Sequence, residues 1–357
     1  MFSHPRHYAA SRLFFKCRRL NARPKSATVH LMTDLSTRYM GLSLANPIIA
    51  GSSGLTGTAK GVKEVEAGGA AAVVLKSIFE EEIASEYAEV LAEAKEKGMS
   101  LESYDYYDYE IRGDRVAAYT DLVREAKKSV SIPVIASVNC TYSREWTSFA
   151  KELERAGADG LELNMFFLPS DLRRSSEERE REYVAVVERV RKEVRIPVAL
   201  KISPYFSTLA QMIQKLSKTG VSALVLFNRF YSIDFDVEKL AVTAANALST
   251  PAEIAAPLRW IALMANRVGC DLAASTGIHD GAAVIKQLLA GARAVQIVST
   301  LYKNGAGAVR AMIAELEAWM DRHGFKAIAD FRGKMSQAAS EDPAVYERVQ
   351  FMKQYGR

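Results

Sequence analysis

The residues of this chain most able to do chemistry are polar and glycine positions that end short apolar runs. They comprise two lysines, three asparagines and four small residues, namely Lys76, Lys201, Asn139, Asn164, Asn228, Ser53, Thr276, Gly277 and Ser299. No His, Asp or Glu leads this set, whereas hydrolysis usually needs a bound metal or a His with a carboxylate. Asparagine amides can hydrogen-bond the edges of a planar ring, and lysines favour an anionic form of a ligand. We therefore expect a site that binds an electron-rich planar ligand and holds no metal.

A second group of residues suggests that this ligand carries a phosphate. Residues 275–281 follow the seventh apolar run and precede a helical stretch, and Ser299 and Thr300 follow the eighth run. Loops in these positions, together with a helix N-terminus, bind phosphate in α/β barrels. An ordinary Thr-Gly turn at Thr276 and Gly277 would explain the same residues without a ligand.

Purely structural roles compete with these functional ones. An asparagine at a strand end can simply cap the next turn, although three such residues in one chain favour ligand binding. A lysine buried inside a barrel is costly to desolvate without a partner, which favours a functional role for Lys76 and Lys201.

The elements that must position these residues repeat along the chain. Four segments, 67–76, 157–164, 219–228 and 290–300, each place a glycine after a helix-period stretch, then an apolar run, then a polar residue. The glycine can take the left-handed conformation that ends a helix, and the apolar run suits a strand buried on both faces. Eight such runs can be counted: 46–51, 71–75, 133–138, 157–164, 197–202, 223–227, 271–275 and 294–298.

This repetition predicts an α/β protein, a closed (β/α)8 TIM barrel over residues 32–340 with its polar residues at the carboxyl rim. Residues 1–31 are expected to form a basic leader without fixed structure, and residues 341–357 a C-terminal tail.

The charge of the chain is concentrated in this leader. Residues 1–31 contain seven Lys or Arg and no Asp or Glu, so the formal charge of +5 leaves about −2 for the rest. The body of the protein is therefore not predicted to bind nucleic acid. The leader could also be an organelle presequence or a membrane-surface anchor around Leu13–Phe15. No run approaches the roughly 20 apolar residues of a transmembrane helix.

Cysteine usage indicates a reducing compartment. Cys17, Cys140 and Cys270 are widely spaced and form no C-x-x-C pair, so no zinc site or iron–sulfur cluster is expected on this chain. We expect a cytoplasmic protein that acts on a small molecule.

Several of these segments, taken in order, are similar to one known family. They are Asn46–Gly54, Leu75–Ser77, Glu162–Asn164, Leu200–Phe206, Phe227–Asn228, Thr276–Ile278 and Gln296–Ser299. Together they resemble the dihydroorotate dehydrogenase family over about residues 32–334, most closely a divergent branch called dihydroorotate dehydrogenase-like. Residues 135–140 are also similar to the FMN barrel of dihydropyrimidine dehydrogenase. The resemblance implies an FMN-dependent oxidoreductase that moves a hydride from a reduced pyrimidine ring to the flavin, in pyrimidine biosynthesis.

The resemblance also implies roles for individual residues. FMN contacts are implied for Ser53, Lys76, Ser77, Asn164, Lys201, Gly277 and Ser299, to which we add the strand-end residues Asn139 and Thr276. Lys201 would lie near N1 and the C2 carbonyl of the flavin, where positive charge stabilises the reduced anion. Substrate contacts are implied for Lys76, Asn164 and Asn228, and we assign Lys76 and Asn164 to catalysis.

Departures from the family pattern put the substrate in question. Phe167 stands where the family has a proton-abstracting Cys or Ser, and a phenyl ring cannot accept a proton. Pro169 replaces an orotate-binding Asn, and the tyrosine-rich stretch 103–112 replaces the family's substrate segment. Arg229 stands where a small residue is expected, and could bind a substrate carboxylate or phosphate. Nearby candidates for the base are Ser170, Asp171 and Tyr205.

Two alternatives remain open beside oxidation of dihydroorotate. The first is an FMN barrel with a different substrate, and the second is a flavin-free barrel that serves as a binding or scaffold protein through residues 103–112. The electron acceptor is equally open between a membrane quinone, a fumarate-like soluble acceptor and oxygen. A homodimer is one expectation, because barrels of this family often pair.

Overall fold

In the computed structural model of this chain, residues 33–79, 116–139, 146–165, 168–229, 233–244 and 247–347 are described. The predicted leader, the tyrosine-rich stretch 103–112, Phe167 and the tail from residue 348 lie outside these ranges.

Eight parallel strands form the centre of the molecule. They are β3 (Ile48–Ala50), β4 (Ala72–Val74), β6 (Val134–Asn139), β7 (Gly160–Asn164), β8 (Val198–Ile202), β9 (Ala223–Leu226), β12 (Asp271–Ser275) and β13 (Ala294–Ile297). Each pairs in parallel with the next in this order, and β13 pairs with β3, so the sheet closes into a ring. A two-residue strand, β5 (Ile78–Phe79), extends the pairing with β6. The predicted TIM barrel is confirmed, and each of the eight predicted runs contains a barrel strand.

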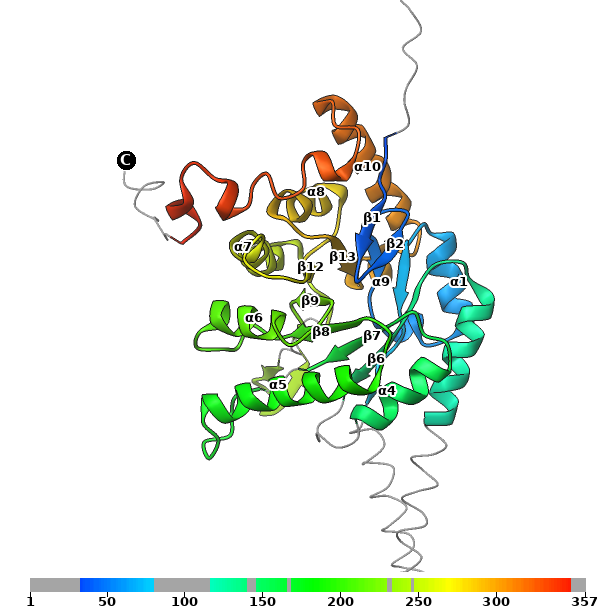
Figure 1. Cartoon of the computed structure of the whole chain (residues 1–357), viewed down its shortest axis with the longest axis vertical. Coiled ribbons are helices and arrows are strands. Elements are labelled where there is room, and N and C mark those ends of the chain that lie inside the picture. The colour runs from blue at the N-terminus through cyan, green and yellow to red at the C-terminus, as the bar shows by residue number, and fades with distance from the viewer. Residues whose placement is uncertain are drawn as a thin grey trace, which may run out of the picture. The chain divides into compact units, whose positions relative to one another are not determined.

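Helices surround this ring, as Figure 1 shows. They are α1 (Ala59–Ala67), α4 (Trp146–Arg155), α5 (Ser176–Glu193), α6 (Leu209–Ser217), α7 (Ala255–Met264), α8 (Gly281–Ala290), α9 (Ser299–Asn304) and α10 (Ala308–His323), with a further helical stretch at 116–129. Local signals set their ends: the side chain of Asp280 accepts from the N–H of Ala283 to begin α8, and Gly291 at φ 121° ends it. The chain can therefore turn directly into β13.

The barrel interior is closed at its amino-terminal end. A hairpin of β1 (Thr37–Tyr39) and β2 (Leu42–Leu44) packs Tyr39 and Met40 against inward-facing side chains of the strands. The carboxylate of Asp271 accepts from the N–H of Met40 at 3.0 Å and pairs with Arg293 at 3.1 Å. A ligand of the barrel therefore has to bind at the opposite, carboxyl end.

A long segment between β9 and α7, residues 227–254, lies at the carboxyl end of the barrel and is called the excursion below. It contains the antiparallel pair β10 (Ile233–Asp236) and β11 (Ala241–Ala244), followed by the short helix η2 (Pro251–Ile254). A further short helix, η1 (Gly54–Thr56), follows β3, and η3 (Ile328–Asp330), η4 (Gln337–Ala339) and η5 (Pro343–Tyr346) follow α10.

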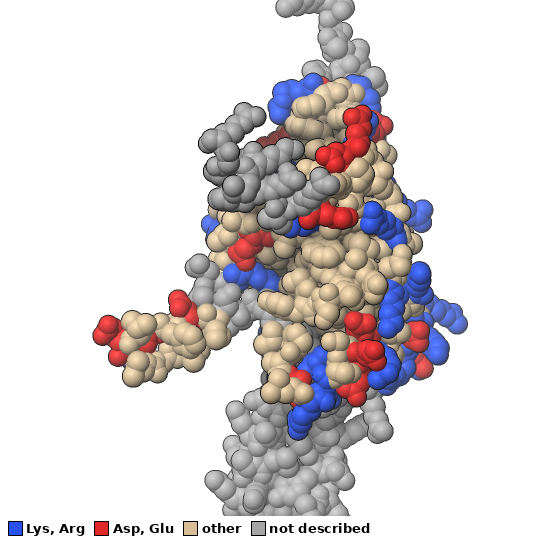
Figure 2. All heavy atoms as spheres, turned by 90° about the vertical axis from the view of Figure 1, so that its left-hand side faces the viewer, with Lys and Arg blue, Asp and Glu red and all other residues tan. Residues whose placement is uncertain are grey.

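The face shown in Figure 2 carries mixed charge. Lys and Arg side chains lie near Asp and Glu side chains there, around a broad area of uncharged residues. Among the described residues, no helix combines the length and apolar character needed to cross a membrane.

Candidate functional site

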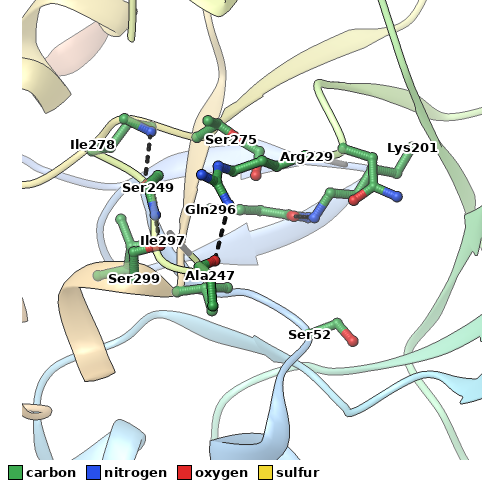
Figure 3. A pocket seen from close by; sticks show the side chains of 14 residues that line it. Ser52, Lys201, Arg229, Ala247, Ser249, Ser275, Ile278, Gln296, Ile297 and Ser299 are labelled. Carbon is green, nitrogen blue, oxygen red and sulfur yellow. Dashed lines mark hydrogen bonds between the residues drawn. The ribbon is translucent and has the colours of Figure 1, made fainter. Parts of the chain in front are cut away.

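A polar cavity of about 240 Å³ lies at the carboxyl ends of the strands. Lys201 and Gln296 come from the strands themselves, Asn228 and Arg229 follow β9, and the loops after β12 and β13 supply Gly277 and Ser299. The returning end of the excursion completes the wall with Ala247 and Ser249 (Figure 3). Several residues that the sequence singled out therefore border one cavity.

A chain of buried polar groups runs down from this cavity into the barrel. The Nζ of Lys201 donates to Oε1 of Gln296 at 3.0 Å, and Nε2 of Gln296 donates to Oε2 of Glu162. All three residues are buried, Lys201 being 7% exposed and Glu162 1%. Burial lowers the pKa of Lys201, whereas the negative charge of Glu162 acts to raise it.

Two asparagine amides lie on either side of this lysine. Asn164 ends β7 and Asn228 follows β9, while Lys201 belongs to the intervening β8. The Nδ2 of Asn228 donates to Oδ1 of Asn164 at 2.8 Å. This bond leaves further donors and acceptors on both amides for a ligand.

The loops after β12 and β13 meet at Ser249. Its hydroxyl accepts from the N–H of Gly277 at 3.4 Å, and its own N–H donates to Oγ of Ser299 at 2.8 Å. Thr276 and Gly277 both have positive φ, 82° and 76°, and both line the cavity. These groups form a small cradle of hydroxyl and N–H groups, which is the chemistry of an anion site.

His279 and Lys303 support this cradle from behind. The Nε2 of His279 lies 3.1 Å from Oγ of Ser249, and its Nδ1 lies 3.2 Å from Oγ1 of Thr300. The Nζ of Lys303 donates to the carbonyl of Ser249 at 2.8 Å. Burial and the nearby Lys303 lower the pKa of His279, so the neutral ring is favoured.

Arg229 fastens the excursion to the rim. Its Nε donates to Oε1 of Glu253 at 2.6 Å, and a terminal nitrogen donates to the carbonyl of Ala247 at 2.9 Å. Figure 3 shows the guanidinium reaching across the cavity toward Ala247. The other oxygen of Glu253 accepts from the N–H of Thr250 at 2.6 Å, which orders the turn that carries Ser249.

A second, less polar cavity of about 620 Å³ adjoins the first. The two share Asn228, Arg229 and Thr276 in their walls. Leu168 and Tyr205 also line the larger one. Space for a second ligand therefore lies beside the paired amides.

A serine cluster occupies the rim near β3, β4 and β6. The hydroxyl of Ser77 lies 3.1 Å from that of Ser52 and 2.7 Å from that of Ser137. The buried Oγ of Ser53 has no hydrogen-bond partner among the described residues. Asn139 is half-buried at the end of β6.

The expectation that Lys76 is buried inside the barrel is wrong. Lys76 is exposed, between the buried residues Leu75 and Ser77 that follow β4, and its side chain lies beside Gly57. It does not line the polar cavity, whose buried lysine is Lys201.

The candidate bases lie on loops beside the larger cavity. Ser170 is exposed, and Tyr205 lines this cavity. Hydrogen bonds from the N–H and side chain of Arg173 lower the pKa of Asp171, which makes it a poor proton acceptor near neutral pH. Phe167, which takes the place of the family's base, lies outside the described residues.

Three residues of the site were not predicted. Ser249 could have been found from Thr250, Pro251 and Glu253, which read as the start of a helix. Glu162 and Gln296 are polar residues inside otherwise apolar strand runs. Polar residues are unusual there, because burying them is costly, so their presence indicates a functional role inside the barrel. No cluster of three or more His, Cys, Asp or Glu able to hold a metal occurs among the described residues.

A closed (β/α)8 barrel with a buried lysine and paired amides at its carboxyl rim is the architecture of a barrel enzyme whose site lies at the carboxyl ends of the strands. A family model described as Dihydroorotate dehydrogenase matches residues 34–320, and the chain belongs to this family. Members of the family are oxidoreductases that act on CH–CH bonds, and this protein is one of them.

Curated relatives cover most of the chain at moderate identity. The catalytic subunit named dihydroorotate dehydrogenase B (NAD(+)) of Thermoplasma volcanium is 29% identical, over 85% of this chain and 98% of its own length. The same subunit of Thermoplasma acidophilum is also 29% identical, over 85% and 99%. Dihydroorotate dehydrogenase A (fumarate) of Lactococcus lactis is 24% identical, over 84% and 99%.

Proposed function

We propose that the protein is an FMN-dependent dehydrogenase that oxidises dihydroorotate, or a closely related reduced ring, by hydride transfer to the flavin in pyrimidine biosynthesis. The observation that carries this proposal is that Lys201, Asn228 and the Ser249 cradle surround one cavity, with the amide of Asn164 bonded to that of Asn228. Bound FMN would supply the hydride acceptor.

The residues present fit FMN. The Gly277 N–H and the hydroxyls of Ser249 and Ser299 are suited to the phosphate, because they are neutral polar groups that the loops after β12 and β13 and the end of the excursion bring together. Lys201 and Gln296 are suited to the edge of the flavin ring. The unpartnered hydroxyl of Ser53 is a further group available to the cofactor. In this proposal Lys76, Ser77, Asn139, Asn164 and Thr276 complete the FMN contacts from the rim.

The space at the rim is also adequate for two ligands. The polar cavity alone, at about 240 Å³, is slightly below the roughly 300–1,000 Å³ of typical ligand sites. The adjoining cavity adds about 620 Å³ and shares three wall residues with it. The cofactor would therefore extend from the cradle toward Asn228, and the substrate would bind on the side of the larger cavity.

The chain's own residues then have distinct tasks. Asn164 and Asn228 would orient the substrate ring through their remaining donors and acceptors, and Lys201 would supply positive charge that favours the reduced flavin. Lys76 and Arg229 approach the substrate from the outer rim. We assign proton acceptance to Ser170 or Tyr205 rather than to Asp171, whose pKa is lowered by its hydrogen bonds to Arg173.

A different substrate in the same site is the second candidate. It is favoured by Arg229, which sits between the two cavities, and by the size of the less polar one. A substrate with an added carboxylate or phosphate could compete with Glu253 for the guanidinium.

One experiment separates these candidates. The purified protein is examined for flavin absorbance and then mixed with dihydroorotate without oxygen; bleaching of the flavin is expected. A flavoprotein that dihydroorotate does not bleach would leave the second candidate, and Arg229→Ser should then change the range of compounds that do. A colourless protein that does not bind added FMN would refute both and favour a scaffold.

The electron acceptor can be identified in the same assay. The names of the relatives include both NAD(+) and fumarate forms. Reoxidation of the bleached protein by fumarate, a quinone, oxygen, or NAD with an added partner subunit distinguishes these routes. We further propose a cytoplasmic protein and a homodimer.

A further inference from the structure

The barrel contains a buried carboxylate that the proposed reaction does not use. Glu162 lies in the middle of β7, two residues before Asn164, and its side chain points into the barrel. One of its oxygens accepts from Gln296, and the other has no hydrogen-bond partner among the described residues. A buried carboxylate is costly to retain unless a positive charge compensates it.

The direction of the hydrogen bonds links Glu162 to Lys201. The Lys201 ammonium can only donate, so Gln296 must present its carbonyl oxygen to it. The amide NH₂ of Gln296 then faces Glu162, which accepts. The amide is therefore polarised along one line, from the carboxylate to the ammonium.

The other titratable groups that face Glu162 are anionic or neutral. The phenol of Tyr39 is fully buried, and burial and Glu162 raise its pKa far above its usual value, so it stays neutral. The same holds for Tyr119, whose hydroxyl bonds the main chain of Ser137. Asp271 and Cys270 lie at the amino end, where burial raises the pKa of the Cys270 thiol to about 12. Among the described residues facing this carboxylate, Lys201 is thus the cation that balances it.

We propose that Glu162 is a positioning residue that acts through the Gln296 amide to keep Lys201 protonated at the floor of the cavity. With Glu162 in place, the ammonium persists although it is buried. Without it, burial is unopposed, and Lys201 loses its proton at a lower pH. This inference deepens the proposed function, and its effect on flavin depends on that function.

The first test needs no flavin. Unfolding by urea is measured for the wild type and Glu162→Gln between about pH 7 and 9, where tyrosines remain neutral in the folded and unfolded chains. At some pH values Lys201 has lost its proton in the folded variant but keeps it in the folded wild type. At these pH values the unfolded variant binds one proton more than the folded variant. The folding constant of the variant relative to the wild type should then rise with pH, by up to tenfold per pH unit.

Two further variants control this measurement. Glu162→Asp retains the charge and should keep the wild-type pH profile. The double variant Lys201→Met, Glu162→Gln has neither group, so its folding constant relative to the wild type should stay the same at every pH in this range. Parallel profiles for the wild type and Glu162→Gln would refute the inference.

The second test asks whether the same charge reaches the cofactor. The midpoint potential of bound FMN is measured against pH. Removing a negative charge at fixed Lys201 protonation raises the potential, whereas loss of the Lys201 proton lowers it. We expect Glu162→Gln to raise the potential at low pH and to lower it below the wild type at higher pH.

The outcomes of the two tests are distinguishable. A shift of the same sign at every pH means that Glu162 acts only as a distant charge, and the inference fails while the proposed function stands. If the wild type binds no FMN, the proposed function fails, and the urea profiles still decide whether Glu162 controls the Lys201 proton. Asp271→Asn, at the other end of the barrel, should give only a shift of constant sign.

Discussion

Gly277 packs directly against the main chain of the excursion beside the cradle. It has φ 76°, and a Cβ built on it would lie 2.1 Å from the backbone nitrogen of Ile254. The clash is with main chain and not with a flexible side chain, so the excursion would have to move. Only a glycine lets the excursion pack against the loop after β12 and bring Ser249 to the Gly277 N–H.

We therefore expect Gly277→Ala to weaken FMN binding at least tenfold and to lower the free energy of unfolding by about 1–3 kcal/mol, the usual range for a strained backbone position. Equilibrium dialysis of FMN and urea unfolding measure the two effects. Gly41→Ala is the matched control, because Gly41 has φ 82° but its Cβ would meet nothing within 4 Å. Equal loss of FMN affinity in both variants would contradict a specific role of the Gly277 contact.

Lys76 and Lys201 show how environment separates two residues of one type. Both follow or end strand runs, and both were predicted to be buried. Lys201 is the next-to-last residue of β8 and its side chain bonds Gln296 inside the barrel, whereas Lys76 lies two residues past the end of β4 and is exposed. Loss of water around the buried Lys201 lowers the pKa of this lysine.

At the scale of elements, the segment between β9 and α7 forms one wall of the site. The Arg229–Glu253 pair and the bonds from Thr250 hold η2 against the rim. Burial acts to raise the pKa of Glu253, but hydrogen bonds from Arg229 and Thr250 outweigh it and bring this pKa below its usual value.

The sign of the resulting pH dependence follows from this lowered pKa. The stability from ionised Glu253 is present above its unfolded pKa of about 4.3 and is lost as the pH falls through the lower folded value. We expect the stability advantage of the wild type over Glu253→Gln to shrink as the pH falls from about 5 to 3, measured by urea unfolding. Other carboxylates titrate equally in both proteins and cancel in the difference.

Arg229→Met should also lower the free energy of unfolding relative to the wild type. The double variant Arg229→Met, Glu253→Gln should lose little more stability than either single variant, because the two residues act as a pair. An advantage that stays constant down to pH 3 would show that the pair does not hold η2.

At the scale of the whole molecule, the closed barrel has one open end. The β1–β2 hairpin fills the amino end, so the chemistry is confined to the carboxyl rim (Figure 1). Residues 33–357 form one compact unit. None of the residues assigned to the site belongs to the basic leader.

Removal of residues 1–32 should leave FMN affinity and the unfolding temperature unchanged, while the formal charge falls by seven. Dialysis and calorimetry of residues 33–357 check the first two, and ion-exchange elution checks the third. Loss of flavin from the shortened protein would place part of the leader in the binding site.

The sequence by itself determined the architecture of this protein. The eight barrel strands were predicted because the apolar run of a buried strand is a local feature, and four of these runs follow a glycine that ends a helix-period stretch. The β1–β2 hairpin and the β10–β11 pair were not predicted. Local patterns also placed Asn164, Lys201, Asn228, Thr276, Gly277 and Ser299 at strand ends. The carboxyl ends of parallel strands must meet at one rim, so their clustering followed from the fold class.

The tertiary structure alone decided which of these residues touch. Ring closure brings β13 beside β3 and β7 opposite β13, which joins Glu162 to Gln296 across 134 positions of sequence. It also places Ser249 in the cradle and leaves Lys76 at the outer edge. Such contacts depend on the register between distant strands and on the path of a long excursion, and neither is encoded in any short stretch of the chain.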